Sequence, residues 1–505
     1  MTGAASIAPQ PVVQRRWVLQ AGAALVVLLA LFLLWSFGGA LIDDAFITLR
    51  YADTLRDAGH WGFYPDAVTN TATAPLNVML TALVGLVVRD LPTTAWVLAA
   101  LELLALGLVW VSLGRHLMGK PVLGVVAAGL VVANPLLLSS LGLEGVLYVT
   151  LTGVALALFT RERWAALGGI LGLLTLTRPD GVLLALVMAA FTVARCRSVR
   201  PVLVALAAFS AVVLPWLLYS WVVVGGLVPD TLFIKVSQRR WGPWTFLDGP
   251  VFYARLFPLA WALTWLPVLP AALAFRVPQP EVRRLAAVLV AFALAYYLAY
   301  VTLGVPPYHW YYGPVVGAGL LVSALGLTAS LRDRALLVPA VAAVLTVVLF
   351  APPGRRAGEV PIHTNWATPA QYRAMARALD AAVPPGQPVG LEGEVGALGF
   401  YAARRLHNGF STPERRAFIR EELEGRGGLL RAFGRLNFRF YEPLPSAPPP
   451  AWALLGTPGP MRRVAAPVAG SLPLPPGAVR ARWRIESRPF APGAYTLYGP
   501  PITRP

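Results

Sequence analysis

The chain has 505 residues, of which 57% are hydrophobic and only 13% charged, and its formal net charge is +18. Soluble domains carry about 25% charged residues, so this composition excludes an ordinary soluble enzyme and a disordered scaffold. The single cysteine excludes an internal disulfide and a metal site built from several thiolates. In a membrane protein the basic excess is expected in cytoplasmic loops and at anionic lipid, not on nucleic acid.

The first apolar run, residues 17–37, follows Arg15 and Arg16. It is too long for a signal peptide and lacks a small-residue cleavage site, so we interpret it as a membrane helix after a cytoplasmic tail, residues 1–16. Further apolar stretches that approach membrane-crossing length recur as far as residue 351, about twelve in all. The later ones lie near residues 74–88, 94–113, 121–139, 145–160, 164–177, 179–194, 201–223, 256–275, 284–304, 312–330 and 334–351.

Basic residues recur in every second loop, and the positive-inside rule places those loops in the cytoplasm. They are Arg115 with Lys120, Arg161 with Arg163, Arg195 with Arg197 and Arg200, Arg276 with Arg283 and Arg284, and Arg332 with Arg334. The other loops, and everything after Phe350, then lie outside, which requires an odd number of crossings. Because the run 74–88 is short and starts beside Pro75, we expect a re-entrant or half-spanning segment and eleven crossings, with thirteen as the alternative.

From residue 351 the composition changes to proline, glycine and arginine. An amphipathic helix is predicted from Thr368 to Ala382, starting at a Thr-Pro cap. Strands are predicted at 388–391 and 405–408 around a helical turn at 395–402, a loop at 444–476, and a hairpin at 482–498 turning at residues 492–493. The predicted fold class is therefore an all-α polytopic membrane protein, with about 11 to 13 transmembrane helices in residues 17–351. An extracytoplasmic α/β domain, residues 352–505, follows.

The first external loop, residues 38–73, carries the adjacent carboxylates Asp43 and Asp44. Apolar residues at helical spacing predict a helix along the membrane interface here. Neighbouring residues on a helix point about 100° apart, so both carboxylates cannot serve one proton. We expect one to act as a base or to stabilise a cation, and the other to position the loop or a substrate. The alternative is a helix N-terminus with favourable first-turn charges.

Other external loops carry further polar and aromatic groups that a structural role would also explain. Glu144 is a helix cap in that alternative, Arg178 before Pro179 a helix break, and Lys235 with Arg239 a phospholipid contact. His309, Trp310 and Tyr311 would then belong to an interfacial aromatic belt. Their common side of the membrane makes all of them candidates for one site.

These elements, in this order, resemble the GT-C superfamily of polyprenyl-phosphate-sugar glycosyltransferases, in particular the actinobacterial terminal β-arabinofuranosyltransferase group. The elements are residues 43–47 with 50–52, 142–144, 178–181, 229–235 and 310–312. The resemblance covers residues 17–350. The chain departs from the pattern at 70–77, where many relatives have a glycine-rich stretch ending in a bulky aromatic residue, and in its short external domain.

The resemblance implies an enzyme in the cell membrane that moves a sugar, most closely arabinofuranose, from a polyprenyl-phosphate donor to a cell-wall glycan at the outer face. By this pattern Asp43 or Asp44 is the essential carboxylate, and Arg50 and Tyr51 accompany it as substrate-binding residues. A mannosyltransferase or a protein glycosyltransferase of the same fold is the nearest alternative, and no residue here separates a pentose pocket from a hexose pocket.

The chemistry of the residues agrees with this reading. The chain has no Rossmann glycine fingerprint, and outside the cell no nucleotide sugar exists, so the donor must come from the membrane. A leaving phosphate requires cations, for which Lys235 is the first candidate and Arg178 and Arg239 are second.

The acceptor hydroxyl requires a base, or the developing oxocarbenium ion a carboxylate, which is the role of Asp44 or Asp43. Glu144 would orient the acceptor, and Trp310, Tyr311 and His309 would form a stacking wall. No cluster demands a metal ion, although a divalent cation at Asp43 and Asp44 stays open.

Two other classes of function make different predictions. A lipid or glycan transporter would place ionisable groups near mid-membrane and often show repeated halves, whereas here most charges fall in external loops. A non-catalytic assembly protein would tolerate replacement of Asp43, Asp44 and Lys235.

Overall fold

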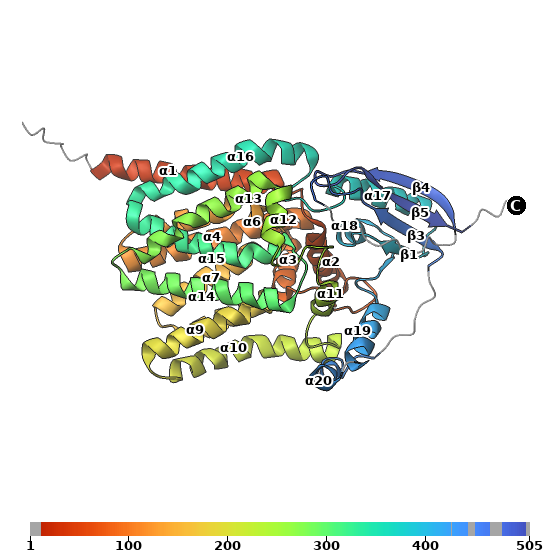
Figure 1. Ribbon diagram of the computed structural model, residues 1–505, viewed down its shortest axis with the longest axis horizontal. Coiled ribbons are helices and arrows are strands. Elements are labelled where there is room, and N and C mark those ends of the chain that lie inside the picture. The colour runs from red at the N-terminus through yellow and green to blue at the C-terminus, as the bar shows by residue number, and fades with distance from the viewer. Residues whose placement is uncertain (1–11, 426, 443–449, 465–476, 501–505) are drawn as a thin grey trace, which may run out of the picture.

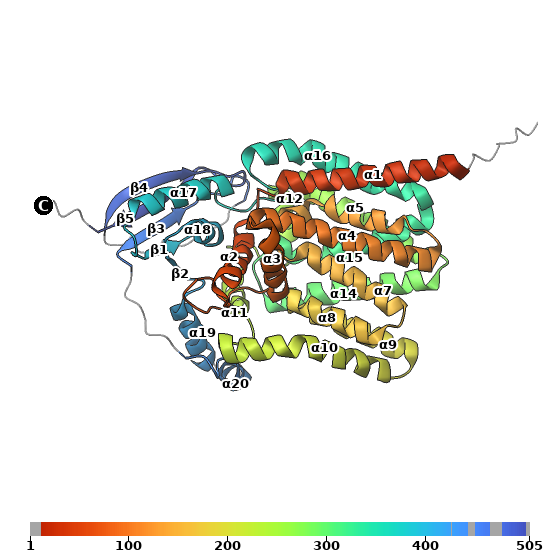
Figure 2. The same cartoon turned by 180° about the vertical axis from the view of Figure 1, so that it is seen from behind.

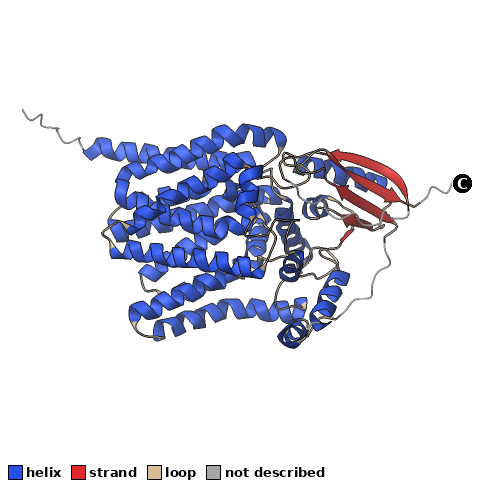
Figure 3. Cartoon of the chain, viewed as in Figure 1, coloured by secondary structure: helices blue, strands red, loops and turns tan. Residues whose placement is uncertain are grey.

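The computed structural model describes residues 12–425, 427–442, 450–464 and 477–500. It has two parts, a bundle of long helices and a smaller α/β domain at one end of the bundle (Figure 1). The strands all lie in the smaller part (Figure 3). The predicted combination of a helical membrane bundle with a C-terminal α/β domain is therefore confirmed.

Eleven apolar helices run along the bundle between Val12 and Ala357 (Figures 1 and 2). Several are long and apolar enough to cross a membrane alone, so the chain is a multi-pass membrane protein. The helices are α1 (Val12–Phe37), α4 (Leu91–Met118), α5 (Leu123–Val132) continued by α6 (Pro135–Ser139), α7 (Gly145–Thr160), α8 (Trp164–Thr177), α9 (Gly181–Cys196), α10 (Arg200–Tyr219) continued by η1 (Ser220–Val224), α13 (Pro258–Trp265) continued by η2 (Leu266–Phe275), α14 (Pro280–Leu303), α15 (Gly313–Leu331) and, after η4 (Arg332–Leu336), α16 (Leu337–Ala357). Helix α1 begins five residues before the apolar run, and part of the predicted tail, residues 1–11, lies outside the described residues.

Two helices lie across the domain end of the bundle, α2 (Asp43–Ala58) and α3 (Pro75–Val88) (Figure 2). At a rise of 1.5 Å per residue the 14 residues of α3 reach only about 21 Å, less than the hydrocarbon thickness of about 30 Å. Helix α3 packs against α2 and α4. The apolar run at 74–88 is therefore not one of the eleven helices that run along the bundle, which we call the lengthwise helices.

The loops with the recurring basic residues join α4 to α5, α7 to α8, α9 to α10, η2 to α14 and α15 to α16. Because successive helices alternate in direction, these loops share the end of the bundle where α1 begins, opposite the C-terminal domain (Figure 1). The charge asymmetry of the sequence is thus an asymmetry between the two ends of the molecule.

The C-terminal domain is built on a sheet of order β2-β1-β3-β5-β4. Strand β1 is parallel to β2 and β3, whereas β5 is antiparallel to β3 and β4. The strands are β1 (Val389–Glu392), β2 (Leu406–Asn408), β3 (Trp452–Thr457), β4 (Ala478–Ile485) and β5 (Gly493–Gly499). The predicted terminal hairpin is confirmed, but residues 486–492 form its connection and Gly493 already belongs to β5.

Helix α17 (Pro369–Ala382) begins as predicted at Thr368, whose hydroxyl accepts from the Gln371 amide in a capping box. Helix α18 (Gly396–Tyr401) lies between β1 and β2 in the chain, also as predicted. The expectation of a loop at 444–476 is wrong for β3, because its apolar run pairs with two neighbouring strands although prolines precede it. Residues 444–449 and 465–476 of that predicted loop lie outside the described residues. Helices α19 (Pro413–Gly425) and α20 (Gly428–Asn437) were not anticipated from the sequence.

Candidate functional site

The two adjacent aspartates at the start of α2 point to different partners. Asp43 Oδ2 accepts from the Gly396 amide at 2.9 Å and Oδ1 from the Ala397 amide at 2.7 Å. Its carboxylate therefore caps α18 of the C-terminal domain and makes no cap bond within α2 itself. A Cβ atom on Gly396 would lie 1.9 Å from the Asp43 carbonyl oxygen, so this close contact requires glycine.

Burial, together with the charge of Asp44, raises the pKa of Asp43 to about 6, although the two backbone amides lower it. Glu394 of the C-terminal domain accepts from the Trp366 amide at 2.8 Å and from the Tyr372 hydroxyl. Burial raises the pKa of Glu394 well above its ordinary value, and the charges of Asp43 and Asp44 add to that rise. The C-terminal domain thus brings a third carboxyl group close to the two aspartates.

Asp44 is the more accessible of the pair, and it faces a lysine. Its side chain is 29% exposed, and Oδ2 lies 3.9 Å from Lys235 Nζ, whose side chain is 10% exposed. The Lys235 ammonium lies 3.8 Å from the centroid of the Tyr308 ring. Burial alone lowers the pKa of Lys235, but Tyr308, Asp44 and Tyr311 together raise it above its ordinary value, so the side chain stays charged.

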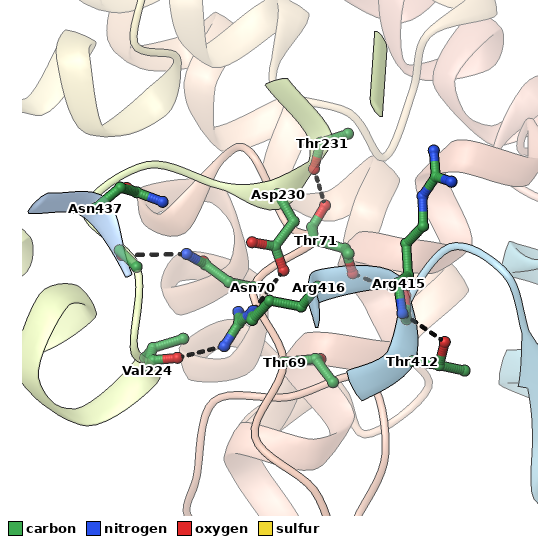
Figure 4. A network of polar contacts seen from close by, with 12 residues as sticks. Thr69, Asn70, Thr71, Val224, Asp230, Thr231, Thr412, Arg415, Arg416 and Asn437 are labelled. Atoms are coloured by element: carbon green, nitrogen blue, oxygen red, sulfur yellow. Dashed lines mark hydrogen bonds and ion pairs between the residues drawn. The ribbon is translucent and has the colours of Figure 1, made fainter. Parts of the chain in front are cut away.

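Lys235 does not lie on a loop, as the sequence suggested, but on α11 (Asp230–Gln238). The Asp230 amide donates to the Asn70 carbonyl at 2.8 Å, and the Thr231 hydroxyl donates to the Thr71 carbonyl at 2.6 Å. Figure 4 shows the contact between Thr231 and Thr71 at the start of α11. The segment 69–71 therefore positions the helix that carries Lys235.

Two further contacts hold this arrangement. Tyr51, predicted to bind substrate, is fully buried, and its hydroxyl bonds to Thr69 at 2.7 Å and to Thr71 at 2.9 Å. Asp230 pairs with Arg416 of α19 at 2.8 Å, and both side chains are 6% exposed (Figure 4). Tyr51 and Arg416 thus act on Lys235 through α11 and not by direct contact.

A second buried cluster surrounds Arg178, at the end of α8. Its guanidinium donates to Glu144 Oε1 at 2.6 Å, to Asp180 Oδ2 at 2.9 Å and to the Tyr300 hydroxyl at 2.6 Å. It also lies 5.4 Å from the ring centroid of Tyr311. Arg178 and Glu144 are therefore paired with each other inside a buried cluster.

The remaining candidates have other partners. His309 is fully buried, with its ring 6.0 Å from that of Tyr253, whereas the ring of Tyr308 lies over the Lys235 ammonium. Trp310 packs on Tyr308 at 4.6 Å between ring centroids. Arg239 is exposed at the C-terminal end of α11, and Arg50 donates to the Phe63 carbonyl and to Asp53.

Sequence reasoning missed the residues that the C-terminal domain contributes. The Phe410 ring lies 5.8 Å from Lys235 Nζ, and Asn365 accepts from the Asp43 amide at 2.9 Å. No local pattern marks Phe410, Asn365 or Glu394, because each reaches the site only through long-range packing. Tyr308 did have a signal, since it belongs to the same aromatic run as Trp310 and Tyr311.

The contacts of Asp43 and Asp44 bear on whether the two carboxylates could hold a divalent cation. Both oxygens of Asp43 accept backbone amides. Among the described residues no three His, Cys, Asp or Glu side chains are grouped so as to hold a metal ion. The two carboxylates therefore have separate partners, backbone amides for Asp43 and Lys235 for Asp44.

The chain is similar in structure to ArnT from Cupriavidus metallidurans bound to undecaprenyl phosphate, with a TM-score of 0.60, 15% identity, and 96% and 98% of the two chains covered. Archaeal oligosaccharyltransferase AglB from Archaeoglobus fulgidus, in complex with an inhibitory peptide and a dolichol-phosphate, aligns with a TM-score of 0.52, 13% identity, and 88% and 70% covered. This chain has the GT-C fold.

The predicted GT-C fold class is therefore confirmed. The structure of the arabinosyltransferase EmbB from Mycobacterium smegmatis aligns with a TM-score of 0.39 and 16% identity, over 76% of this chain and 34% of EmbB. This likeness is too weak to support the arabinosyltransferase group. No family model and no curated protein matches the sequence.

Proposed function

We propose that this chain is a membrane glycosyltransferase that transfers a sugar from a polyprenyl-phosphate donor to a cell-envelope glycan on the outer face of the membrane. The observation that carries the proposal is the Asp44–Lys235 pair, a partly exposed carboxylate 3.9 Å from a buried ammonium at the junction of bundle and domain. The GT-C fold supports it, since two solved structures of this fold contain undecaprenyl phosphate or a dolichol-phosphate.

The pair supplies the two charges that sugar transfer requires. The acceptor oxygen bonds to the anomeric carbon of the sugar while the bond from that carbon to the phosphate oxygen breaks. Asp44 takes the hydroxyl proton, and the phosphate leaves as polyprenyl phosphate with its added negative charge facing Lys235. Tyr308 and Phe410 pack around the ammonium and limit water there, which strengthens its attraction for the phosphate.

Arabinofuranose is the sugar that the sequence resemblance favours, and mannose is the alternative for the same fold. We therefore compare radiolabelled decaprenyl-phosphoryl-arabinose with polyprenyl-phosphoryl-mannose, using purified full-length protein and synthetic arabinan or mannan acceptors. Product with the arabinose donor alone supports the finer assignment, and product with the mannose donor alone replaces it.

The same assay tests the roles of the pair. Asp44→Asn is expected to lower kcat by about 10²- to 10⁴-fold, the range for loss of a general base. Lys235→Met is expected to lower it by about 10²- to 10³-fold, as for loss of one charge-stabilising donor. Asp57→Asn, an exposed carboxylate on the same helix, and Lys120→Met, the other lysine, are the controls. Wild-type transfer by folded Asp44→Asn protein would overturn the proposal, as would failure of both donors in protein that binds polyprenyl phosphate.

A further inference from the structure

A pocket separate from the Asp44–Lys235 pair lies between α2 and the C-terminal domain. Its volume is about 220 Å³, and residues of both halves of the chain line it. Arg50 comes from α2, Tyr64 and Asp66 from the segment after α2, and Arg404 and Arg405 from the approach to β2. The pocket therefore exists only when the domain is docked on the bundle.

Three guanidinium groups and a single carboxylate line this pocket, so its charge is positive. Arg50 is held by the Phe63 carbonyl and Asp53, and Arg404 by the carbonyls of Val383 and Asp380. A guanidinium has five N–H donors, so Arg50 and Arg404 keep donors beyond those used in these contacts. Because the contacts already hold both side chains in place, they lose less conformational entropy when an anion binds.

Arg405 and Asp66 form the more open side of the pocket. Their side chains are 36% and 60% exposed and form an ion pair, and the Arg405 guanidinium lies 5.0 Å from the centroid of the Tyr64 ring. The Tyr64 hydroxyl donates to the Leu406 carbonyl at 2.8 Å, which fixes the ring beside the cations. The pocket thus combines an aromatic ring with guanidinium groups that suit a carboxylate or phosphate.

The pocket is linked to the reaction site by two elements. Arg50 follows Asp44 by six residues on α2, a rise of about 9 Å along the axis. On the domain side, Leu406 lines the pocket and Phe410, four residues later, reaches Lys235. The pocket and the reaction site therefore share one helix and one segment of the domain.

We propose that this pocket binds an anionic group, a carboxylate or phosphate, on the acceptor glycan. The assignment rests on the proposed function and adds the chemical class of its acceptor. The glycan is favoured over a lipid headgroup because the domain segment before β2 forms one wall of the pocket, and the lengthwise helices contribute none of its lining.

The test measures binding without any donor, so it is independent of sugar transfer. Full-length protein in phosphatidylcholine nanodiscs is titrated with fluorescent trigalacturonic acid and, as the neutral match, with galactotriose. We expect the anionic probe to bind at least about 10-fold more tightly, and Arg405→Gln to weaken it about 10-fold, as for loss of a charged hydrogen bond. Arg482→Gln, an exposed arginine on β4, is the control and should bind as the wild type does.

A second variant distinguishes loss of binding from a folding defect. Asp66→Asn removes the negative charge beside Arg405 and is expected to tighten binding of the anionic probe severalfold. Equal affinity for the two probes, or wild-type binding by Arg405→Gln, would overturn the inference. Displacement of the anionic probe by phosphatidylglycerol nanodiscs would reassign the pocket to a lipid headgroup. Retained anionic binding with no transfer from any donor would leave the pocket standing and reject only the proposed reaction.

Discussion

Asp43 and Asp44 follow one another in the chain, yet Asp43 docks the C-terminal domain and Asp44 faces Lys235. The direction of side chains on a helix explains the division, since neighbours point about 100° apart. The sequence could show that the two carboxylates would have different roles. It could not assign them, because the partners of Asp43 lie more than three hundred residues later in the chain.

The buried carboxyl of Asp43 predicts a specific dependence of stability on pH. Its pKa is about 6 in the folded protein and 3.8 as its ordinary value, so folding takes up a proton between these values. The stabilisation is fully present below about pH 3.8 and is lost as the pH rises through 6, and its size is about 3 kcal/mol. Asp43→Asn cannot titrate, so the difference in Tm, wild type minus variant, should grow as the pH falls from 8 to 4.

Tryptophan fluorescence of the purified protein on heating measures these Tm values. Asp57→Asn, whose parent carboxylate is 61% exposed, serves as the control and should show little change of the difference with pH. A wild-type-minus-Asp43→Asn difference that stays constant from pH 4 to 8 would contradict the prediction.

At the scale of elements, α11 depends on a helix from the other half of the chain. Arg416 of α19 pairs with Asp230 and also donates to the Val224 carbonyl at 2.6 Å. The start of α11 therefore rests on the segment 69–71 and on α19 together (Figure 4). Neither α11 nor α19 was inferred from the sequence. Helix α11 has only nine residues, and contacts with distant segments hold its start.

Arg416→Met tests this dependence. It leaves the Asp230 carboxylate buried without its partner, which costs about 3–5 kcal/mol, so amide hydrogen exchange in residues 224–238 should accelerate and sugar transfer should fall. Arg420→Met, one turn later in α19, breaks a partly exposed pair with Glu424 and should cost under about 1 kcal/mol. The double variant Asp230→Asn/Arg416→Met should recover part of the protection. Equal exchange in Arg416→Met and Arg420→Met would disprove the dependence.

The whole molecule is polarised, with basic loops at one end of the bundle and the C-terminal domain at the other (Figure 1). The positive-inside rule predicts that the domain end faces outward. In a Cys196→Ala background, Arg377→Cys on α17 should react with a membrane-impermeant maleimide in intact cells. Arg163→Cys, also at an exposed position but between α7 and α8, should react only after permeabilisation, and the reverse pattern would invert the orientation.

The amino-acid sequence by itself determined the membrane class, the lengthwise helices and several domain elements such as α17. These follow from the composition of contiguous segments and from a local cap, and neither needs a distant partner. The tertiary structure alone decided which aspartate faces Lys235, that Arg178 and Glu144 are occupied by one another, and that β3 is a central strand. Each of these depends on residues far apart in the chain, where packing and burial select one partner among several that the sequence leaves equivalent.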